Sequence, residues 1–220
     1  METDPLSLSA VLPPAVLSMV AVTALVFCDY RDLRPGRFIF KPLAAIAFVW
    51  LGLRLGATDS SYGQWLLGGL VLCLFGDLFL MPEDKRSFLA GLGAFLCGHL
   101  LYAIAFLQLP LNWTGLVVSA VPALLLMTLV LRWLMPHVDA DMKTPVLLYT
   151  AVITLMLLCA GLSAGQAAAP WIIAGAWGFA ASDVAVARQQ FVSPGHGNRL
   201  WGTPLYFFAQ LLLAASIAYA

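Results

Sequence analysis

The sequence predicts an all-α protein, a polytopic transmembrane bundle of about eight helices, and three observations support this fold class. First, 62% of the 220 residues are hydrophobic and only 10% are charged, whereas an average soluble domain is about 45–50% apolar and about 25% charged. Second, long apolar segments recur along the whole chain. Third, eight spans of roughly 20 residues leave room only for short connections. We therefore expect a single integral membrane domain over 1–220, with no soluble domain appended.

Hydropathy predicts where the helices cross the membrane. The expected spans are 11–29, 38–56, 64–81, 87–107, 114–135, 145–163, 167–187 and 201–219. Proline-containing stretches, which favour turns, follow the first, third, fourth, fifth and seventh spans. The chain begins with Glu2 and Asp4 and no basic residue, unlike a signal peptide, so we expect the first span to be retained as a helix.

The basic residues predict how the bundle is oriented. Ten of the eleven lysines and arginines lie in or beside the loops that follow the first, third, fifth and seventh spans, and Arg54 is the exception. By the positive-inside rule these four loops face the cytoplasm and both termini face outside. The short loops and ends lead us to expect a multi-pass protein of the bacterial inner membrane. The net charge is zero and no basic block occurs, so no nucleic-acid partner is expected.

Cysteine and histidine spacing argues against a metal site. The four cysteines stand singly in apolar segments, without the CxxC spacing that zinc sites use. His99, His137 and His196 are dispersed along the chain, which disfavours a three-histidine zinc hydrolase. We therefore expect no metal and no organic cofactor.

Two aspartates and a lysine fall inside predicted spans at one shared depth. Asp77 and Asp183 lie near the cytoplasmic ends of the third and seventh spans, and Lys41 lies in the first turn of the second. An ionisable group in hydrocarbon costs at least about 2.5–3.5 kcal/mol and usually faces a cavity or a partner. If the two carboxyl groups are close, both cannot ionise cheaply, which leaves an acid beside a base. The alternative is that both are helix-end residues that pair with Lys or Arg and hold the bundle together.

Three other polar residues inside the spans are candidates for the same site. His99 lies deeper in the fourth span, and Tyr102 follows at i+3 on the same helix face. A structural hydrogen bond and a chemical role are both open for His99. Tyr149 is either a cleft residue or an interfacial anchor, because tyrosine is common at membrane surfaces.

The last span carries one polar stripe on an otherwise apolar helix. Its members, at i, i+4, i+7 and i+11, are Arg199, Thr203, Tyr206 and Gln210. Such a stripe forms either an interhelical hydrogen-bond ladder or the wall of a polar cleft.

The two aspartates also suggest an internal repeat. Gly76-Asp77 and Ser182-Asp183 each end a span, and a short polar loop and another span follow. Because the two segments have the same orientation, the repeat would be a parallel four-plus-four pseudo-repeat. Chance recurrence in a chain rich in small residues is the alternative.

Several short motifs occur in a fixed order over roughly 38–215. They are Lys41-Pro42, Gly76-Asp77, Phe88-x-x-Gly91-x-x-x-Phe95-x-x-x-His99-x-x-Tyr102, Ser182-Asp183 and Pro204-Leu205-Tyr206-x-x-Ala209-Gln210. With these motifs the chain resembles the YhhN-type lysoplasmalogenase family, which consists of eight-helix integral membrane proteins. The resemblance implies hydrolysis of the vinyl-ether bond of a lysoplasmalogen, which releases a fatty aldehyde and a glycerophospho-ethanolamine or -choline. A lysophospholipid substrate and membrane lipid are then the expected partners.

The resemblance also implies roles for individual residues. Asp77 and Asp183 match the paired aspartates of the family and would be catalytic, although the sequence does not say which is the acid. Lys41, His99, Tyr206 and Gln210 match the other polar positions of the family motifs. Together with Tyr102, Tyr149 and Arg199, which the spans themselves point to, they are the expected substrate-binding residues, with Lys41 and Arg199 at the phosphate and the others lining the cleft. A proton-coupled transporter of small molecules or lipids is the alternative function, because proton relays also use intramembrane Asp and His. A homo-oligomer stays open.

Overall fold

In the computed structural model, which describes residues 7–82 and 84–220, every regular element is helical. The long helices are α1 (Leu8–Tyr30), α2 (Arg34–Arg54), α3 (Ser61–Phe79), α4 (Lys85–Phe106), α5 (Trp113–Leu134), α6 (Lys143–Leu162), α7 (Ala169–Ala187) and α8 (His196–Ala215). All eight are long and apolar enough to cross a membrane, which confirms the predicted fold class. The largest difference is at the start of α8, which begins at His196 and not at residue 201. Its first turn is polar, so hydropathy does not include this turn in the predicted span. Glu2 and Asp4 lie outside the described residues.

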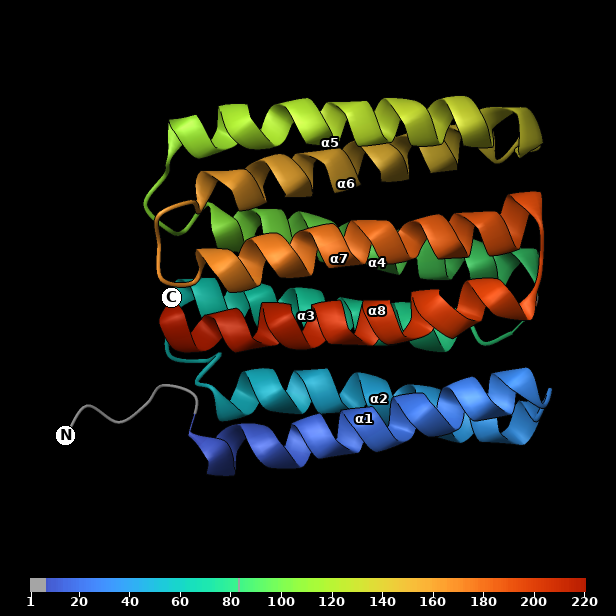
Figure 1. The fold of residues 1–220 in the computed structure, drawn as a ribbon, viewed down its shortest axis with the longest axis horizontal. Helices are drawn as coiled ribbons and strands as arrows, with labels where there is room; N and C mark the ends of the chain where they lie inside the picture. Colours follow the sequence, from blue (N-terminus) through green and yellow to red (C-terminus); the bar gives the residue numbers. More distant parts are fainter. Residues whose placement is uncertain (1–6, 83) are drawn as a thin grey trace.

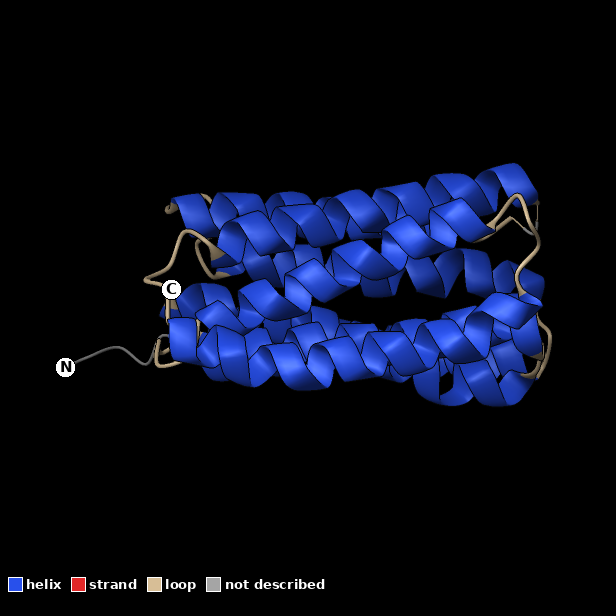
Figure 2. Cartoon of the chain, turned by 90° about the horizontal axis from the view of Figure 1, so that it is seen from above, coloured by secondary structure: helices blue, strands red, loops and turns tan. Residues whose placement is uncertain are grey.

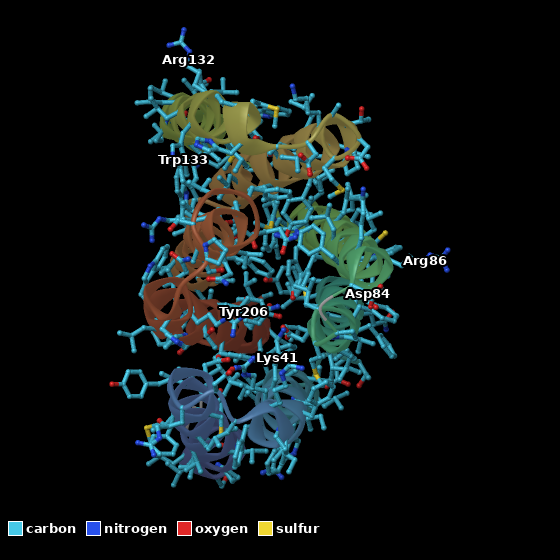
Figure 3. The ribbon with its side chains drawn as sticks, turned by 90° about the vertical axis from the view of Figure 1, so that its right-hand side faces the viewer. Lys41, Asp84, Arg86, Arg132, Trp133 and Tyr206 are labelled. Atoms are coloured by element: carbon cyan, nitrogen blue, oxygen red, sulfur yellow. The ribbon has the colours of Figure 1, made fainter. Side chains whose placement is uncertain are left out.

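The eight helices lie in two layers. Two of the four helical hairpins join the layers, and the other two lie within one layer. The closest pairs are α1 with α2, α3 with α4, α5 with α6, and α7 with α8. One layer contains α2, α3, α4 and α6, and the other contains α1, α8 and α7, with α5 beyond α7 (Figure 3). Seen from above, the helices run nearly side by side, and the loops are confined to the two ends (Figure 2).

The two ends of the bundle differ in charge. The loops after α1, α3, α5 and α7 lie at one end, and α1 begins and α8 finishes at the other (Figure 1). We call the first of these the basic end, because ten of the eleven lysines and arginines belong to it. Figure 3 looks onto this end, with Arg86 and Arg132 pointing outward and Lys41 inside the bundle. Which side of the membrane the basic end faces stays a prediction.

Polar side chains at helix starts explain why two of the spans begin where they do. Asp84 accepts a hydrogen bond from the backbone N–H of Ser87 at 3.0 Å, and Asn112 accepts one from Gly115 at 3.0 Å. Caps of this kind satisfy backbone donors that the first helical turn leaves unpaired. The hydroxyl of Ser87 also donates to Asp84, and these hydrogen bonds hold the pKa of the Asp84 carboxyl group below its usual range.

A close approach of α5 and α6 gives a first testable prediction. A Cβ atom on Gly115 would collide with the carbonyl oxygen of Gly161 and would lie 2.6 Å from Cβ of Ala164. Overpacking of this kind costs about 1–3 kcal/mol, so we expect Gly115→Leu to lower the melting temperature of the detergent-purified protein by several degrees. The matched control is Gly93→Leu, where an added Cβ meets nothing within 4 Å. Equal melting temperatures for the two variants would contradict this packing.

Candidate active site

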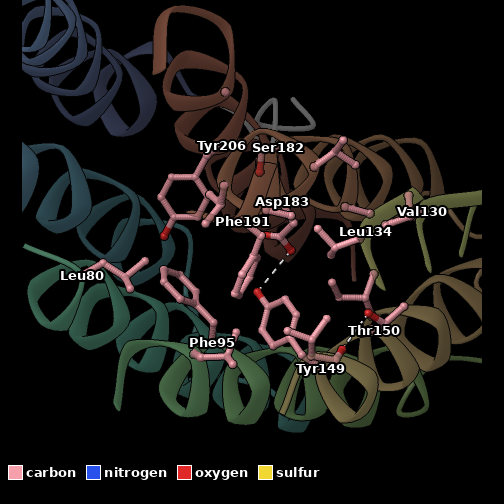
Figure 4. Close-up of a pocket in the computed structure, with 18 of the residues that line it drawn as sticks. Leu80, Phe95, Val130, Leu134, Tyr149, Thr150, Ser182, Asp183, Phe191 and Tyr206 are labelled. Carbon is pink, nitrogen blue, oxygen red and sulfur yellow. Dashed lines mark hydrogen bonds between the residues drawn. The ribbon is translucent and has the colours of Figure 1, made fainter. Parts of the chain in front are cut away.

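The basic half of the bundle contains a pocket of about 150 Å³, which we call the inner pocket. Every helix from α2 to α8 contributes to its lining, which is mostly apolar. Its polar side chains are Lys41, Asp77, Tyr149, Thr150, Ser182, Asp183, Thr203 and Tyr206. The two aspartates predicted to work together therefore face one cavity, and Figure 4 shows Asp183 near its centre.

Asp77 is held by a cation and a hydroxyl group. Its side chain is 3% exposed, and Nζ of Lys41 lies 3.2 Å from its Oδ1. The same ammonium group donates to the backbone carbonyl of Asp77 at 3.1 Å. The hydroxyl of Tyr206 donates to the other carboxyl oxygen at 2.8 Å. Charge-assisted hydrogen bonds of this kind compensate a negative charge at Asp77. The same contacts are expected from the alternative interpretation, in which Asp77 and a lysine form an ion pair that only holds the bundle together.

Asp183 has different partners. The hydroxyl of Tyr149 donates to its Oδ2 at 3.2 Å (Figure 4), and Nε2 of His99 lies 3.7 Å from the same oxygen. Nδ1 of His99 lies 2.6 Å from the carbonyl oxygen of Phe95. A carbonyl only accepts hydrogen bonds, so Nδ1 carries a proton, and a neutral ring turns the lone pair of Nε2 toward Asp183. Within the described residues, no lysine or arginine forms an ion pair with Asp183.

The partners of the two aspartates are related by the predicted repeat. Each aspartate lies on the third helix of its half and is contacted from the second helix of the same half and the fourth helix of the other half. These partners are Lys41 and Tyr206 for Asp77, and Tyr149 and His99 for Asp183. A parallel four-plus-four repeat predicts this exchange of partners between halves. The two aspartates differ in their partners, because only Asp77 has a permanently charged one, Lys41 of the first half.

Three residues expected to line the cleft lie one layer behind its wall. Gln210 donates to the hydroxyl of Tyr206 at 3.1 Å, and the hydroxyl of Tyr102 donates to Gln210 at 2.7 Å. Tyr102, His99 and Gln210 are fully buried, and none of them borders the inner pocket. Two members of the polar stripe on α8, Tyr206 and Gln210, therefore belong to a hydrogen-bond ladder between helices. Tyr206 is also part of the pocket wall.

Arg199 lies outside the inner pocket, in a wider polar opening at the basic end. This opening, of about 860 Å³, is called the vestibule here, and its basic residues are Arg34, Arg37, Lys41, Lys85 and Arg199. Nη1 of Arg199 lies 3.3 Å from Oδ1 of Asp29, and Nε of Arg37 lies 3.0 Å from the same oxygen. Lys41 borders both cavities, so it connects the vestibule with the aspartates.

Sequence reasoning missed some residues around the site. Phe179 packs its ring 4.4 Å from that of His99 and 5.2 Å from that of Tyr206, measured between ring centroids. Its position one turn before Asp183 is the signal that could have identified it. Asp29 resembled an ordinary helix-end residue, and only the fold brings it to two arginines.

The remaining histidines and cysteines take no part in the inner pocket. His137 and His196 are exposed at the basic end, and the four cysteines are free. In the part of the chain that the structure describes, no group of three or more His, Cys, Asp or Glu side chains could hold a metal ion.

Comparison with known proteins decides the family. The YhhN family profile matches residues 36–217. The chain belongs to the YhhN family. It is 32% identical over 179 residues to the human protein named lysoplasmalogenase TMEM86B, a match that covers 79% of this chain and 70% of the relative. It is also 32% identical over 160 residues to a lysoplasmalogenase of Mycobacterium bovis, which covers 69% of this chain and 59% of the relative.

A third relative has the same activity in its name. Lysoplasmalogenase TMEM86A of Bos taurus is 34% identical over 155 residues, which covers 67% of this chain and 62% of the relative. The chain thus matches 59% to 70% of the lengths of these three YhhN relatives. No solved structure matches this chain. The transporter alternative gains no support from these relatives.

Proposed function

We propose that this YhhN-family protein is a membrane lysoplasmalogenase. In this proposal it cleaves the vinyl-ether bond of a lysoplasmalogen to a fatty aldehyde and glycerophospho-ethanolamine or -choline, with its basic end at the cytoplasmic face of a bacterial inner membrane. The names of the relatives support the reaction class. The observation that carries the proposal is the inner pocket, where one aspartate is paired with a lysine and the other lies beside a tyrosine hydroxyl and a histidine, with no lysine or arginine partner among the described residues.

The chemistry of a vinyl ether explains why two unlike aspartates are useful. Hydrolysis begins with transfer of a proton to the vinyl carbon that does not bear oxygen, which leaves an oxocarbenium ion. Water then adds to the oxygen-bearing carbon, and the hemiacetal collapses to an aldehyde as the glycerol oxygen leaves with a proton. The site must therefore supply an acid, a negative charge that stabilises the cation, and a place for water. Glycosidases use a carboxylic acid and a carboxylate for a similar transition state.

The contacts support one division of labour. Asp183 acts as the general acid, because it has no Lys or Arg partner among the described residues to favour its charged form, whereas Asp77 has Lys41. Asp77 acts as the carboxylate that stabilises the oxocarbenium ion, since Lys41 and Tyr206 compensate its charge. After the proton has moved to carbon, Asp183 takes a proton from the attacking water, which restores the acid.

The other residues bind and position the substrate in this proposal. Lys41 and Arg199 contact the phosphate from the vestibule, where Arg199 is held by Asp29. Tyr149 and Tyr206 orient the two carboxyl groups and border the inner pocket. Tyr102 and Gln210 act through Tyr206 and are positioning residues rather than pocket contacts.

The direct test is aldehyde release by the detergent-purified protein. We expect release from a lysoplasmalogen and no release from the matched lysolipid with a saturated alkyl ether, because that bond has no carbon–carbon double bond to protonate. The two lipids have the same head group and chain length, so binding differs little between them. A folded protein that releases no aldehyde from the lysoplasmalogen, or that cleaves both lipids, would contradict the proposed function.

A further inference from the structure

The helix α5 breaks the approximate symmetry of the two halves. In the first half α1 packs on α2 and on α8, whereas α5, its counterpart, packs on α6 and has only sparse contacts with α4 and α7. At the end away from the basic loops, α5 is fixed to α6, where the hydroxyl of Ser119 donates to the carbonyl of Leu157 at 3.0 Å. Toward the basic end, Leu134 of α5 packs in a hydrophobic cluster with Val146 and Ala187, and the inner pocket lies between α5 and α7 beside this cluster.

The pocket wall between these two helices is apolar. Val130 and Leu134 of α5 face the pocket, as do Val184 and Ala187 of α7. Leu134 is 3% exposed, whereas Val130, Val184 and Ala187 are partly exposed. Figure 4 shows Val130 and Leu134 on the side of the pocket opposite Leu80 and Tyr206, with Asp183 between them. The pocket therefore extends past Asp183 toward α5, whose outer face is exposed at Leu125 and Leu129.

The bundle is filled in the other direction. Beyond the aspartates, away from the basic end, the side chains of Tyr102, Phe106 and Phe179 are fully buried in the core. A long alkyl chain has no room along the bundle axis, because protein interiors are packed without large voids. A chain whose linkage sits at the aspartates must leave the pocket sideways.

We propose that the apolar pocket wall between α5 and α7, formed by Val130, Leu134, Val184 and Ala187, is a lateral portal that holds the hydrocarbon chain of the lysolipid and connects it with the membrane. This inference rests on the proposed function. The order of the cavities matches the order of groups in a lysoplasmalogen: the phosphate in the basic vestibule, the vinyl ether at the aspartates and the chain at the apolar portal.

A tryptophan scan of the portal tests this assignment. Val130→Trp and Ala187→Trp fill the portal from its two sides, and Leu129→Trp is the matched control, because Leu129 is adjacent on α5 but 56% exposed and outside the pocket lining. Rates are measured with a long-chain lysoplasmalogen and with a short-chain analogue that has the same head group. We expect both portal variants to lower kcat/KM for the long chain about tenfold or more, since misfit of even one methylene can have this effect.

The short-chain analogue separates a blocked portal from a damaged site. We expect the portal variants to cleave it at rates close to wild type and the Leu129→Trp variant to cleave both substrates normally. Unchanged long-chain cleavage in the folded portal variants, or an equal loss on both substrates, would overturn the portal.

A binding measurement separates failure of the portal from failure of the proposed function. A saturated, uncleavable lysolipid that binds the folded state should raise the melting temperature of wild type and of Leu129→Trp. We expect this rise to be lost in Val130→Trp and Ala187→Trp. If wild type cleaves no lysoplasmalogen but the proteins show this pattern of melting temperatures, the proposed reaction is wrong and the binding site for the hydrocarbon chain is supported. An equal rise in all four proteins overturns the portal, whatever their activity.

Discussion

Asp183→Asn should lower aldehyde release by about 10²–10⁴-fold, the range that general acid catalysis contributes. The amide fits the same space but has no acidic proton for the vinyl carbon. The neighbouring Tyr149 hydroxyl, now 3.2 Å from Oδ2 of Asp183, can still donate to the amide oxygen, so we expect the variant to fold. The measurement is initial rate with a lysoplasmalogen in detergent, alongside the melting temperature.

The matched control for this substitution is Asp141→Asn. Asp141 is an exposed aspartate near the basic end, paired with Lys85, and this ion pair holds the pKa of its carboxyl group below the usual range. Exposed ion pairs contribute little to stability, so we expect neither activity nor melting temperature to change much. If Asp183→Asn kept wild-type activity, the general acid would have to be another residue.

Lys41→Met should have the largest effect on stability. Removing one partner of a buried ion pair leaves an uncompensated charge and typically costs about 3–5 kcal/mol. The side chain of Asp77 is 3% exposed and that of Lys41 is 21% exposed, so Asp77 cannot reach water when its cation is gone. We expect a marked drop in melting temperature and a loss of activity, because the charge at Asp77 is no longer held in place.

A double variant distinguishes an unpaired charge from lost packing. In Lys41→Met/Asp77→Asn both charges are absent, so much of the stability should return while activity stays low. Asp77→Asn alone should be less destabilising than Lys41→Met alone, because the partly exposed ammonium group can turn toward the vestibule. If Lys41→Met were as stable as wild type, the ion pair would not be essential to the fold.

The sequence predicted the fold and the shared depth of Lys41 and Asp77 well, because both depend on simple periodic quantities. Apolar length and composition determine the eight spans. The helical rise then places Lys41 and Asp77 at one depth, and the structure joins them at 3.2 Å. For Tyr206 and Gln210, the i, i+4 spacing predicted one face, and they form a hydrogen bond on it.

The environment of Asp183 was harder to predict from the sequence. The helical backbone continues beyond α7 as a π-helix over Arg188–Val192, so Asp183 lies deeper than its distance from Arg188 suggests. That depth brings it to His99, which the sequence placed in a separate, deeper layer. Tyr149 could equally have been an interfacial anchor, and only the packing of α6 against α7 turns its hydroxyl toward Asp183. Contacts between different helices decide such cases, and the spacing of residues within one helix does not predict them.

The origin of the oxygen atoms in the products tests the central claim most directly, namely that hydrolysis proceeds by protonation of the vinyl ether and addition of water to its oxygen-bearing carbon. The protein is incubated with a lysoplasmalogen in water enriched in ¹⁸O, and the mass of the glycerophospho product is measured. Protonation at carbon sends water to the vinyl carbon, so the glycerol oxygen should keep its original isotope in every product molecule. A glycerophospho product that carries ¹⁸O at this hydroxyl would mean that water attacks the glycerol carbon, which would contradict the mechanism.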